Sequence, residues 1–112
     1  MGIDASIYLK TRDGNEPTLP NQLPGGCRML PVADWAPEGA THAIDQWWRY
    51  YGRGYERGPW PTIAAVLMTL HASPDVETVW YFGDSNDGDD PFTPERVQEL
   101  CAHYMREGHR PY

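Results

Sequence analysis

Two segments of the sequence combine residue types that could bind a ligand or carry out chemistry. The first, residues 52–60, is rich in glycine and carries basic, aromatic and acidic side chains. Its candidate site residues are Arg53, Tyr55, Glu56, Arg57 and Trp60. The second, residues 83–92, is rich in acidic and small polar side chains. Its candidate site residues are Asp84, Ser85 and Asp87. One segment is largely basic and the other acidic, so their charged side chains could pair with each other or with those of a third molecule.

An anionic ligand is the first chemistry that residues 52–60 suggest. Arginine holds phosphate or carboxylate in a bidentate manner, and the glycines at positions 52, 54 and 58 let the backbone approach a ligand closely. Tyr55 or Trp60 could stack on a nucleobase. The segment lacks the Gly-Lys-Ser/Thr of a P-loop, and its glycine spacing differs from the dinucleotide fingerprint. The pattern therefore indicates a phosphorylated small molecule as a class, without naming one.

The acidic segment could instead hold a cation. Counted from Asp84, Asn86 stands at position 3 and Glu95 at position 12, as in a calcium-binding loop. Position 6, where that loop requires glycine, is Asp89. A solvated acidic loop that leads into a helix explains the same residues, so we expect neither a metal site nor a cofactor.

Catalysis by paired carboxylates is a further hypothesis, with Glu56 and Asp84 as the pair. Such chemistry needs a defined separation between the two groups, which the sequence does not supply. The four histidines are scattered over the chain and match no Ser-His-Asp or Cys-His arrangement. His71 lies in an apolar helical stretch, which is typical of a core histidine. We therefore expect no catalytic residue and favour a protein that is not an enzyme.

The aromatic side chains also suit a protein interface, because Trp, Tyr and Arg dominate binding hot spots. The rings in this part of the chain are Trp47, Trp48, Tyr50, Tyr51, Tyr55 and Trp60. A domain of 112 residues is too small to bury all of them, so an exposed patch would suit a partner with a basic surface. Two structural alternatives stay open. Some rings could pack in the core, and the arginines could pair with the aspartates, which contributes about 0–1 kcal/mol for an exposed pair.

The elements around these segments follow from the periodicity of apolar residues. Residues 3–10 alternate apolar and polar side chains, which predicts a half-buried strand. Residues 76–82 are apolar on both faces, which predicts a central strand covered on both sides. Residues 43–51 are dense in aromatic side chains and predict another strand, with a short helix capped by Gly52 as the alternative.

Two helices are predicted as well. Pro61 suits the first turn of a helix, and residues 62–72 are apolar on nearly every side, as in a buried helix. Thr93-Pro94-Glu95 combines a capping hydroxyl, a proline at the first position and a carboxylate against the helix dipole. This second helix is expected to end before Gly108.

A proline-rich segment separates the first strand from the rest. Residues 15–41 contain prolines at positions 17, 20, 24, 31 and 37, and proline interrupts ladders and helices. We expect a covering loop with Trp35 as its anchor and one short strand at 27–30. The chain, residues 1–112, then forms a single α+β domain with α/β character. It has a small mixed sheet of three or four strands and two helices, with one right-handed β-α-β unit followed by a C-terminal helix.

The β-α-β unit would bring the two candidate segments together. Strands 43–51 and 76–82 are expected to form a parallel pair, so residues 52–60 and 83–92 would emerge at the same edge of the sheet. Each segment also leads into a helix N-terminus. Ligands of open α/β sheets bind at the carboxyl edge. The sequence therefore predicts a site where a basic aromatic loop faces an acidic loop.

Composition narrows the class of protein. A content of 40% hydrophobic and 12% aromatic residues is that of a folded chain rather than a disordered one. A net charge of −7 argues against general nucleic-acid binding and against anionic membranes. The chain shows no membrane span and no signal peptide, so we expect a cytoplasmic protein. Cys27 and Cys101 have no metal-ligand spacing and are expected to be buried thiols, with a disulfide as the alternative. The oligomeric state stays open.

Three motifs carry a resemblance to a known group of proteins. They are the opening Met-Gly-x-Asp, the run Trp-Arg-Tyr-Tyr-Gly-x-Gly-Tyr-Glu-Arg-Gly-Pro-Trp-Pro, and Val-Trp-Tyr-x-Gly-Asp-Ser. Together they resemble small uncharacterised proteins of phages and prophages, mainly over residues 47–112. The resemblance implies no activity, cofactor or catalytic residue. It implies an accessory protein in the host cytoplasm that blocks host or anti-phage defence machinery by binding.

The acidic residues bear on how such a protein would bind. They are concentrated in residues 75–95 rather than spread along a surface, which argues against a DNA mimic. We therefore expect a small acidic protein that binds a host protein. The alternative is binding or hydrolysis of a phosphorylated small molecule or nucleotide at the edge formed by 52–60 and 83–92.

Overall fold

The structure, a computed structural model, is described here for five parts of the chain. They are residues 6–23, 27–32, 36–45, 60–82 and 91–106, with the side chains of 60–62, 100, 101 and 103–106 left aside. Within these parts, neither helix has the length and apolar character needed to cross a membrane.

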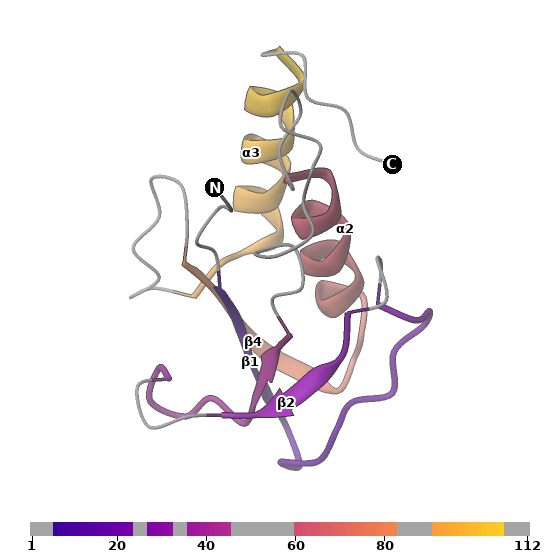
Figure 1. The fold of residues 1–112 in the computed structure, drawn as a ribbon, viewed down its shortest axis with the longest axis vertical. Helices are drawn as coiled ribbons and strands as arrows, with labels where there is room; N and C mark the ends of the chain where they lie inside the picture. The colour runs from indigo at the N-terminus through magenta and orange to yellow at the C-terminus, as the bar shows by residue number, and fades with distance from the viewer. Residues whose placement is uncertain (1–5, 24–26, 33–35, 46–59, 83–90, 107–112) are drawn as a thin grey trace.

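The described residues form one sheet and two helices (Figure 1). The strands are β1 (Ser6–Thr11), β2 (Met29–Pro31), β3 (His42–Ile44) and β4 (Val76–Phe82). The helices are α2 (Trp60–His71) and α3 (Pro94–Arg106). The four strands lie in the order β2-β3-β1-β4, and each neighbouring pair is antiparallel. The predicted α+β class, with up to four strands and two helices, is therefore confirmed.

Strand β1 lies between β3 and β4, and this position corrects one prediction. The unit β3-α2-β4 is present, and β3 and β4 run in the same direction because both are antiparallel to β1. They are not neighbours, however, so the predicted parallel pair is wrong, and within the described residues every neighbouring pair of strands is antiparallel. The order of elements along the chain cannot show that the N-terminal strand inserts between two later ones. Its alternating pattern only requires that one face be buried.

The core forms where β1 and β4 meet α2. In the register of the two strands, Ile7 lies opposite Tyr81 and Leu9 lies opposite Val79. All four side chains are at most 2% exposed. Each fully buried apolar side chain of this kind contributes about 1.5–3 kcal/mol. The alternation seen in the sequence of β1 thus points its apolar residues at the helix layer.

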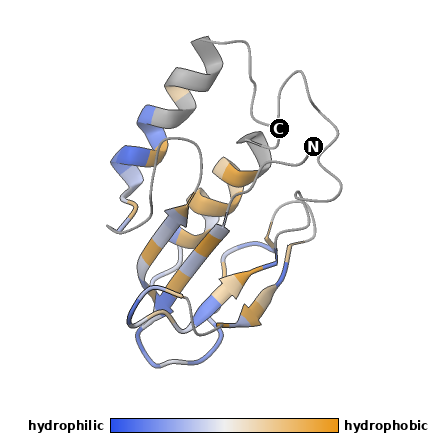
Figure 2. Cartoon of the chain, turned by 60° about the vertical axis from the view of Figure 1, so that its left-hand side comes forward, coloured by the Kyte–Doolittle hydropathy of each residue, from blue (hydrophilic) through white to orange (hydrophobic). Residues whose placement is uncertain are grey.

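Helix α2 supplies the other half of this core. Ile63, Val66, Leu67 and Leu70 recur at helical spacing and are at most 1% exposed. The helix packs against both β4 and α3. Figure 2 shows hydrophobic residues along α2 and the strands, whereas the first turns of α3 are mainly hydrophilic. Among the described side chains of α3, Val97 joins the core and is 1% exposed.

The opposite face of the β1-β4 pair is also buried. Tyr8 and Trp80, which lie opposite each other in the register, are 8% and 7% exposed. The ring of Tyr8 meets the ring of Phe82 edge to face, with 5.7 Å between centroids and an interplanar angle of 83°. Burial of β4 on both faces therefore agrees with its apolar pattern.

The position of β4 differs from the prediction of a central strand. In the described part of the sheet it lies at the edge, with β1 as its one neighbour. Its outer side is covered by the chain that leads into α3, because the backbone N–H of Phe92 donates to the carbonyl oxygen of Val79 at 2.6 Å. Side chains that are buried on both faces show that both faces of the strand are packed against other residues. They do not show how many strands neighbour it in the sheet.

The segment after β1 docks on the turn that joins α2 to β4. Asp13 accepts the backbone N–H of Asn15 at 3.0 Å, which closes a turn in which Gly14 has a φ of 77°. This hydrogen bond lowers the pKa of the Asp13 carboxyl. Farther along, the N–H of Thr18 donates to Asp75 at 2.9 Å, and the hydroxyl of Ser73 donates to the carbonyl of Thr18 at 2.9 Å.

The boundaries of the elements agree with the sequence to different degrees. Strand β4 spans the predicted residues 76–82, and each helix begins within one residue of its predicted start. The short strand predicted at 27–30 is observed as Met29–Pro31. Strand β3 ends at Ile44, and the rest of the predicted strand 43–51 falls mostly outside the described residues. Trp35, the predicted loop anchor, also lies outside them.

Candidate functional site

The predicted site residues fall almost entirely outside the described part of the chain. This holds for Arg53, Tyr55, Glu56, Arg57, Asp84, Ser85 and Asp87. Trp60 is the first residue of α2, and its side chain is not described. What the structure does establish is where the chain leaves the sheet before each segment and where it returns.

The two strands that precede the candidate segments, β3 and β4, end at the same edge of the sheet, and residues 45–51 lie between the end of β3 and the first segment. Phe82, the last residue of β4, pairs with Ser6 at the start of β1, and Ala43 near the end of β3 pairs with Tyr8. The ends of β3 and β4 therefore flank the first residues of β1. Neighbouring strands lie about 4.8 Å apart, so the two strand ends are about 10 Å from each other. The ends of β3 and β4 thus share an edge of the sheet although the two strands are not neighbours, and the distance between these ends is twice that between neighbouring strands.

The acidic segment returns to the same strand that it leaves. Phe92 is 2% exposed, and its ring packs on that of Tyr81 with 5.2 Å between centroids. Its backbone N–H bonds to Val79, as described above. Residues 83–90 are thus bracketed by Phe82 at the end of β4 and by Phe92 against its middle.

Helix α3 begins directly after this anchor, as the sequence predicts. The hydroxyl of Thr93 accepts the backbone N–H of Arg96 at 3.2 Å, and the carbonyl of Thr93 accepts that of Val97 at 3.1 Å. Thr93 is therefore the N-cap, which satisfies one of the backbone donors left free at a helix start. Glu95 lies in the first turn, where a carboxylate is favourable.

His71 lies where α2 ends against the start of α3. Its Nε2 atom is buried and has no hydrogen-bond partner among the described residues. Burial lowers the pKa of the imidazole, while the backbone of Phe92 and the carboxylate of Glu95 act in the opposite direction. These surroundings are those of a packed histidine at a helix junction, which agrees with the sequence expectation for this residue.

A cluster of hydroxyl and imidazole groups lies where β1 meets the start of β3. The hydroxyl oxygen of Thr41 accepts the backbone N–H of Thr11 at 3.0 Å. The same oxygen lies 3.3 Å from the carbonyl of Leu9 and 2.9 Å from Nδ1 of His42. The hydroxyl oxygen of Thr11 lies 3.3 Å from this oxygen as well, so the one proton and two lone pairs of the Thr41 hydroxyl are shared among four neighbouring groups. The cluster links two strands and does not present a nucleophile. No residue spacing in the sequence predicts it.

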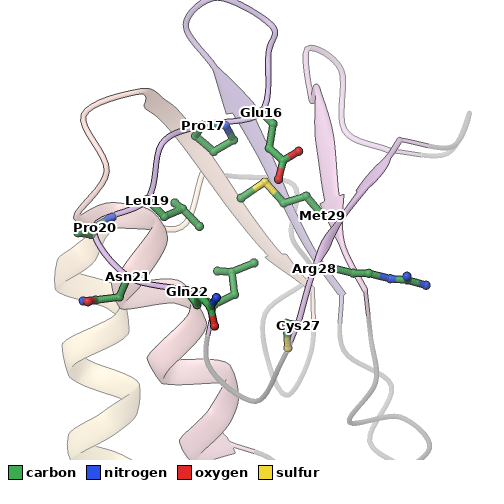
Figure 3. A pocket seen from close by; sticks show the side chains of 10 residues that line it. Glu16, Pro17, Leu19, Pro20, Asn21, Gln22, Cys27, Arg28 and Met29 are labelled. Carbon is green, nitrogen blue, oxygen red and sulfur yellow. The ribbon is translucent and has the colours of Figure 1, made fainter.

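A pocket of about 620 Å³ lies between residues 16–23 and residues 27–29 (Figure 3). Leu19, Leu23 and Met29 give it an apolar base that is continuous with the core. Glu16 points into it, whereas Arg28 points away, where its Nε donates to the carboxylate of Asp45 at 3.1 Å. Sequence reasoning treated this stretch as a covering loop and missed the pocket. The sequence feature that could have indicated the pocket is the mixture of apolar and polar side chains around Pro17 and Pro20.

Neither a metal-binding cluster nor a known relative identifies the chemistry of the described residues. Across residues 6–23, 27–32, 36–45, 60–82 and 91–106, no group of three or more His, Cys, Asp and Glu side chains is placed to hold a metal ion. The chain matches no family model, no curated protein and no solved structure.

Proposed function

We propose that this chain is a small acidic binding protein of the phage-accessory kind, which engages a host or defence protein through residues 52–60 and 83–92. The observation that supports this proposal is the common direction of β3 and β4 on either side of β1. Strand β4 leads directly into the segment with Asp84 and Asp87, and β3 ends at the same edge of the sheet, with residues 45–51 between it and the segment that carries Arg53, Tyr55 and Arg57.

The spacing of the two strand ends favours contact with a partner. A gap of about 10 Å is wider than the separation of adjacent strands, so the ends of β3 and β4 do not pair with each other as neighbouring strands. Aromatic and arginine side chains are the residue types that dominate interface hot spots. The net charge of −7 favours approach by a basic partner surface.

A photo-crosslinking amino acid placed at Tyr55 tests the proposal in a bacterial cytosol. We expect a discrete protein adduct from this position and none from the same group placed at Met68, which is 58% exposed on α2. Arg57→Ala and Asp84→Ala should each remove the adduct without lowering the melting temperature.

Two outcomes would count against the proposal. Equal adducts from Tyr55 and Met68 would mean that crosslinking reports exposure alone. If Arg57→Ala and Asp84→Ala lower the melting temperature together, the two charges pair with each other, and their role is structural.

A phosphorylated small molecule is the alternative, and one observation favours it. The first turn of α2 contains no acidic residue, so the positive end of its dipole is not offset there. The arginine-bearing segment leads directly into this turn, and helix N-termini with arginines suit anions. The test is to measure the melting temperature of the protein with each member of a panel of nucleotides and sugar phosphates, and a rise with one of them would favour this alternative. A ligand at 100 times its Kd would stabilise the fold by about 2.7 kcal/mol.

A further inference from the structure

The pocket of Figure 3 adjoins the sheet at β2. Its lining from the sheet side comes from Cys27, Arg28 and Met29, and the lining opposite comes from residues 16–23. Strand β2 is at the end of the strand order in the described part of the sheet. The pocket is therefore lined in part by the last strand of the described sheet, whose outer side faces away from β3.

The register of β2 determines which backbone groups face that side. The N–H of Asp45 donates to the carbonyl of Arg28 at 2.8 Å, and Leu30 pairs with Ala43. In an antiparallel ladder the residue between two hydrogen-bonded positions turns its N–H and C=O outward. Met29 is that residue, so its backbone groups point away from β3. Pro31, the next outward position, has no N–H and limits further pairing.

The side chains around the pocket specify what could lie there. Leu19, Leu23 and Met29 pack against the core and leave an apolar base. Glu16 points into the pocket and has no ion pair among the described residues. The neighbouring cation, Arg28, is turned away toward Asp45 at 3.1 Å. The pocket is therefore negative at its mouth on a protein whose net charge is −7.

We propose that this pocket binds an extended peptide segment that carries a basic side chain beside an apolar one. The peptide backbone pairs with the outward N–H and C=O of Met29, as in strand addition to a sheet edge. The basic side chain meets the Glu16 carboxylate, and the apolar side chain rests on Leu19 and Leu23. The volume of about 620 Å³ falls within the range of ligand sites. This site shares no residue with the edge formed by 52–60 and 83–92, so it stands apart from the function proposed above.

A positional-scanning library of short acetylated peptides tests the proposal on the full-length protein. One position is fixed as arginine, leucine or glutamate, and binding is followed by amide chemical shifts and hydrogen exchange. We expect the arginine-fixed and leucine-fixed pools to bind best and to protect the Met29 amide from exchange. Glu16→Gln should weaken binding of the arginine pool about tenfold, because it removes one charge-assisted contact. The matched control is Glu38→Gln, an exposed carboxylate elsewhere on the chain, which should leave binding unchanged.

A second variant separates loss of the site from loss of the fold. Gln22 is exposed and lines the pocket, so Gln22→Trp should block binding without changing the melting temperature. The proposal is wrong if the glutamate pool binds as well as the arginine pool, or if Glu16→Gln and Glu38→Gln behave alike. It is also wrong if the Met29 amide gains no protection, or if agmatine alone binds as tightly as the peptides. Loss of peptide binding in Arg57→Ala would assign the peptide to the other edge and overturn this site.

Discussion

Replacing Phe92 by alanine tests how the outer side of β4 is covered. Phe92 is 2% exposed, packs on Tyr81 at 5.2 Å between ring centroids, and donates its backbone N–H to Val79 at 2.6 Å. The substitution keeps the backbone bond and removes the ring. It therefore isolates the contribution of the side chain to the anchor at the end of the acidic segment.

The expected loss can be worked from burial. Truncation of a fully buried phenylalanine to alanine costs about 3–5 kcal/mol, because the transfer energy is lost and a cavity remains. The entropy of unfolding for 112 residues is about 0.24 kcal/mol per kelvin. The melting temperature should therefore fall by roughly 12–20 °C. A domain of this size has a free energy of unfolding of about 6–17 kcal/mol, so the variant is still expected to fold unless the wild type lies at the low end.

Urea unfolding and thermal unfolding measure this loss against two controls. Phe92→Leu keeps most of the apolar volume and should lose less than the alanine variant. Met68→Ala removes a side chain that is 58% exposed on α2, so it should change the free energy of unfolding by no more than about 0.5 kcal/mol. Hydrogen exchange at the Phe92 amide reports the bond to Val79 independently.

A loss of less than about 1 kcal/mol in the free energy of unfolding for Phe92→Ala would refute the reasoning, because truncation of a ring buried against β4 should lower it by more than that. Fast exchange of the Phe92 amide in the wild type would lead to the same conclusion. In either case the outer side of β4 would be open, and the acidic segment would lack its downstream anchor.

Three further predictions concern single contacts. Thr93→Ala removes the N-cap hydroxyl that accepts the N–H of Arg96, so it should lower the free energy of unfolding by about 1 kcal/mol, and Thr93→Ser should recover most of it. Thr41→Val leaves the buried N–H of Thr11 without its acceptor, with an expected loss of about 1–3 kcal/mol in urea unfolding. The pKa of His71 is lowered in the folded state, so the unfolded chain binds the proton more readily. The stabilisation by His71 should therefore be complete above its ordinary pKa of 6.5 and be lost as the pH falls through the folded value. Comparing the pH dependence of unfolding with that of His71→Gln should show a shallower slope for the variant.

Local structure was largely predictable because it depends on neighbours in sequence. The alternation in residues 6–11 places Ile7 and Leu9 on one face, and the cap at Thr93 follows from a hydroxyl before a proline and a glutamate. The packed His71 follows from its place on an apolar helix. Each of these features arises within one or two turns of backbone, where propensity and period act directly.

The candidate site was predictable only in part, and for a different reason. The direction of β3 and β4 follows from a helix that connects them, so the shared edge of the sheet could be expected from the sequence. The insertion of β1 between them could not, and it doubles the separation of the two strand ends to about 10 Å. The pocket beside β2 depends on how residues 16–23 fold back on Met29, which no short-range pattern records.

The amino-acid sequence by itself determined the class of the fold, the types and approximate bounds of its main elements, and the charge that a partner would meet. These properties depend on composition and on periodicity along the chain. Only the tertiary structure decided that β1 is flanked on both sides, that Phe92 covers β4, and that Glu16 and Met29 share a pocket. Contacts of this kind join residues far apart in sequence, and their selection depends on the packing of the whole domain.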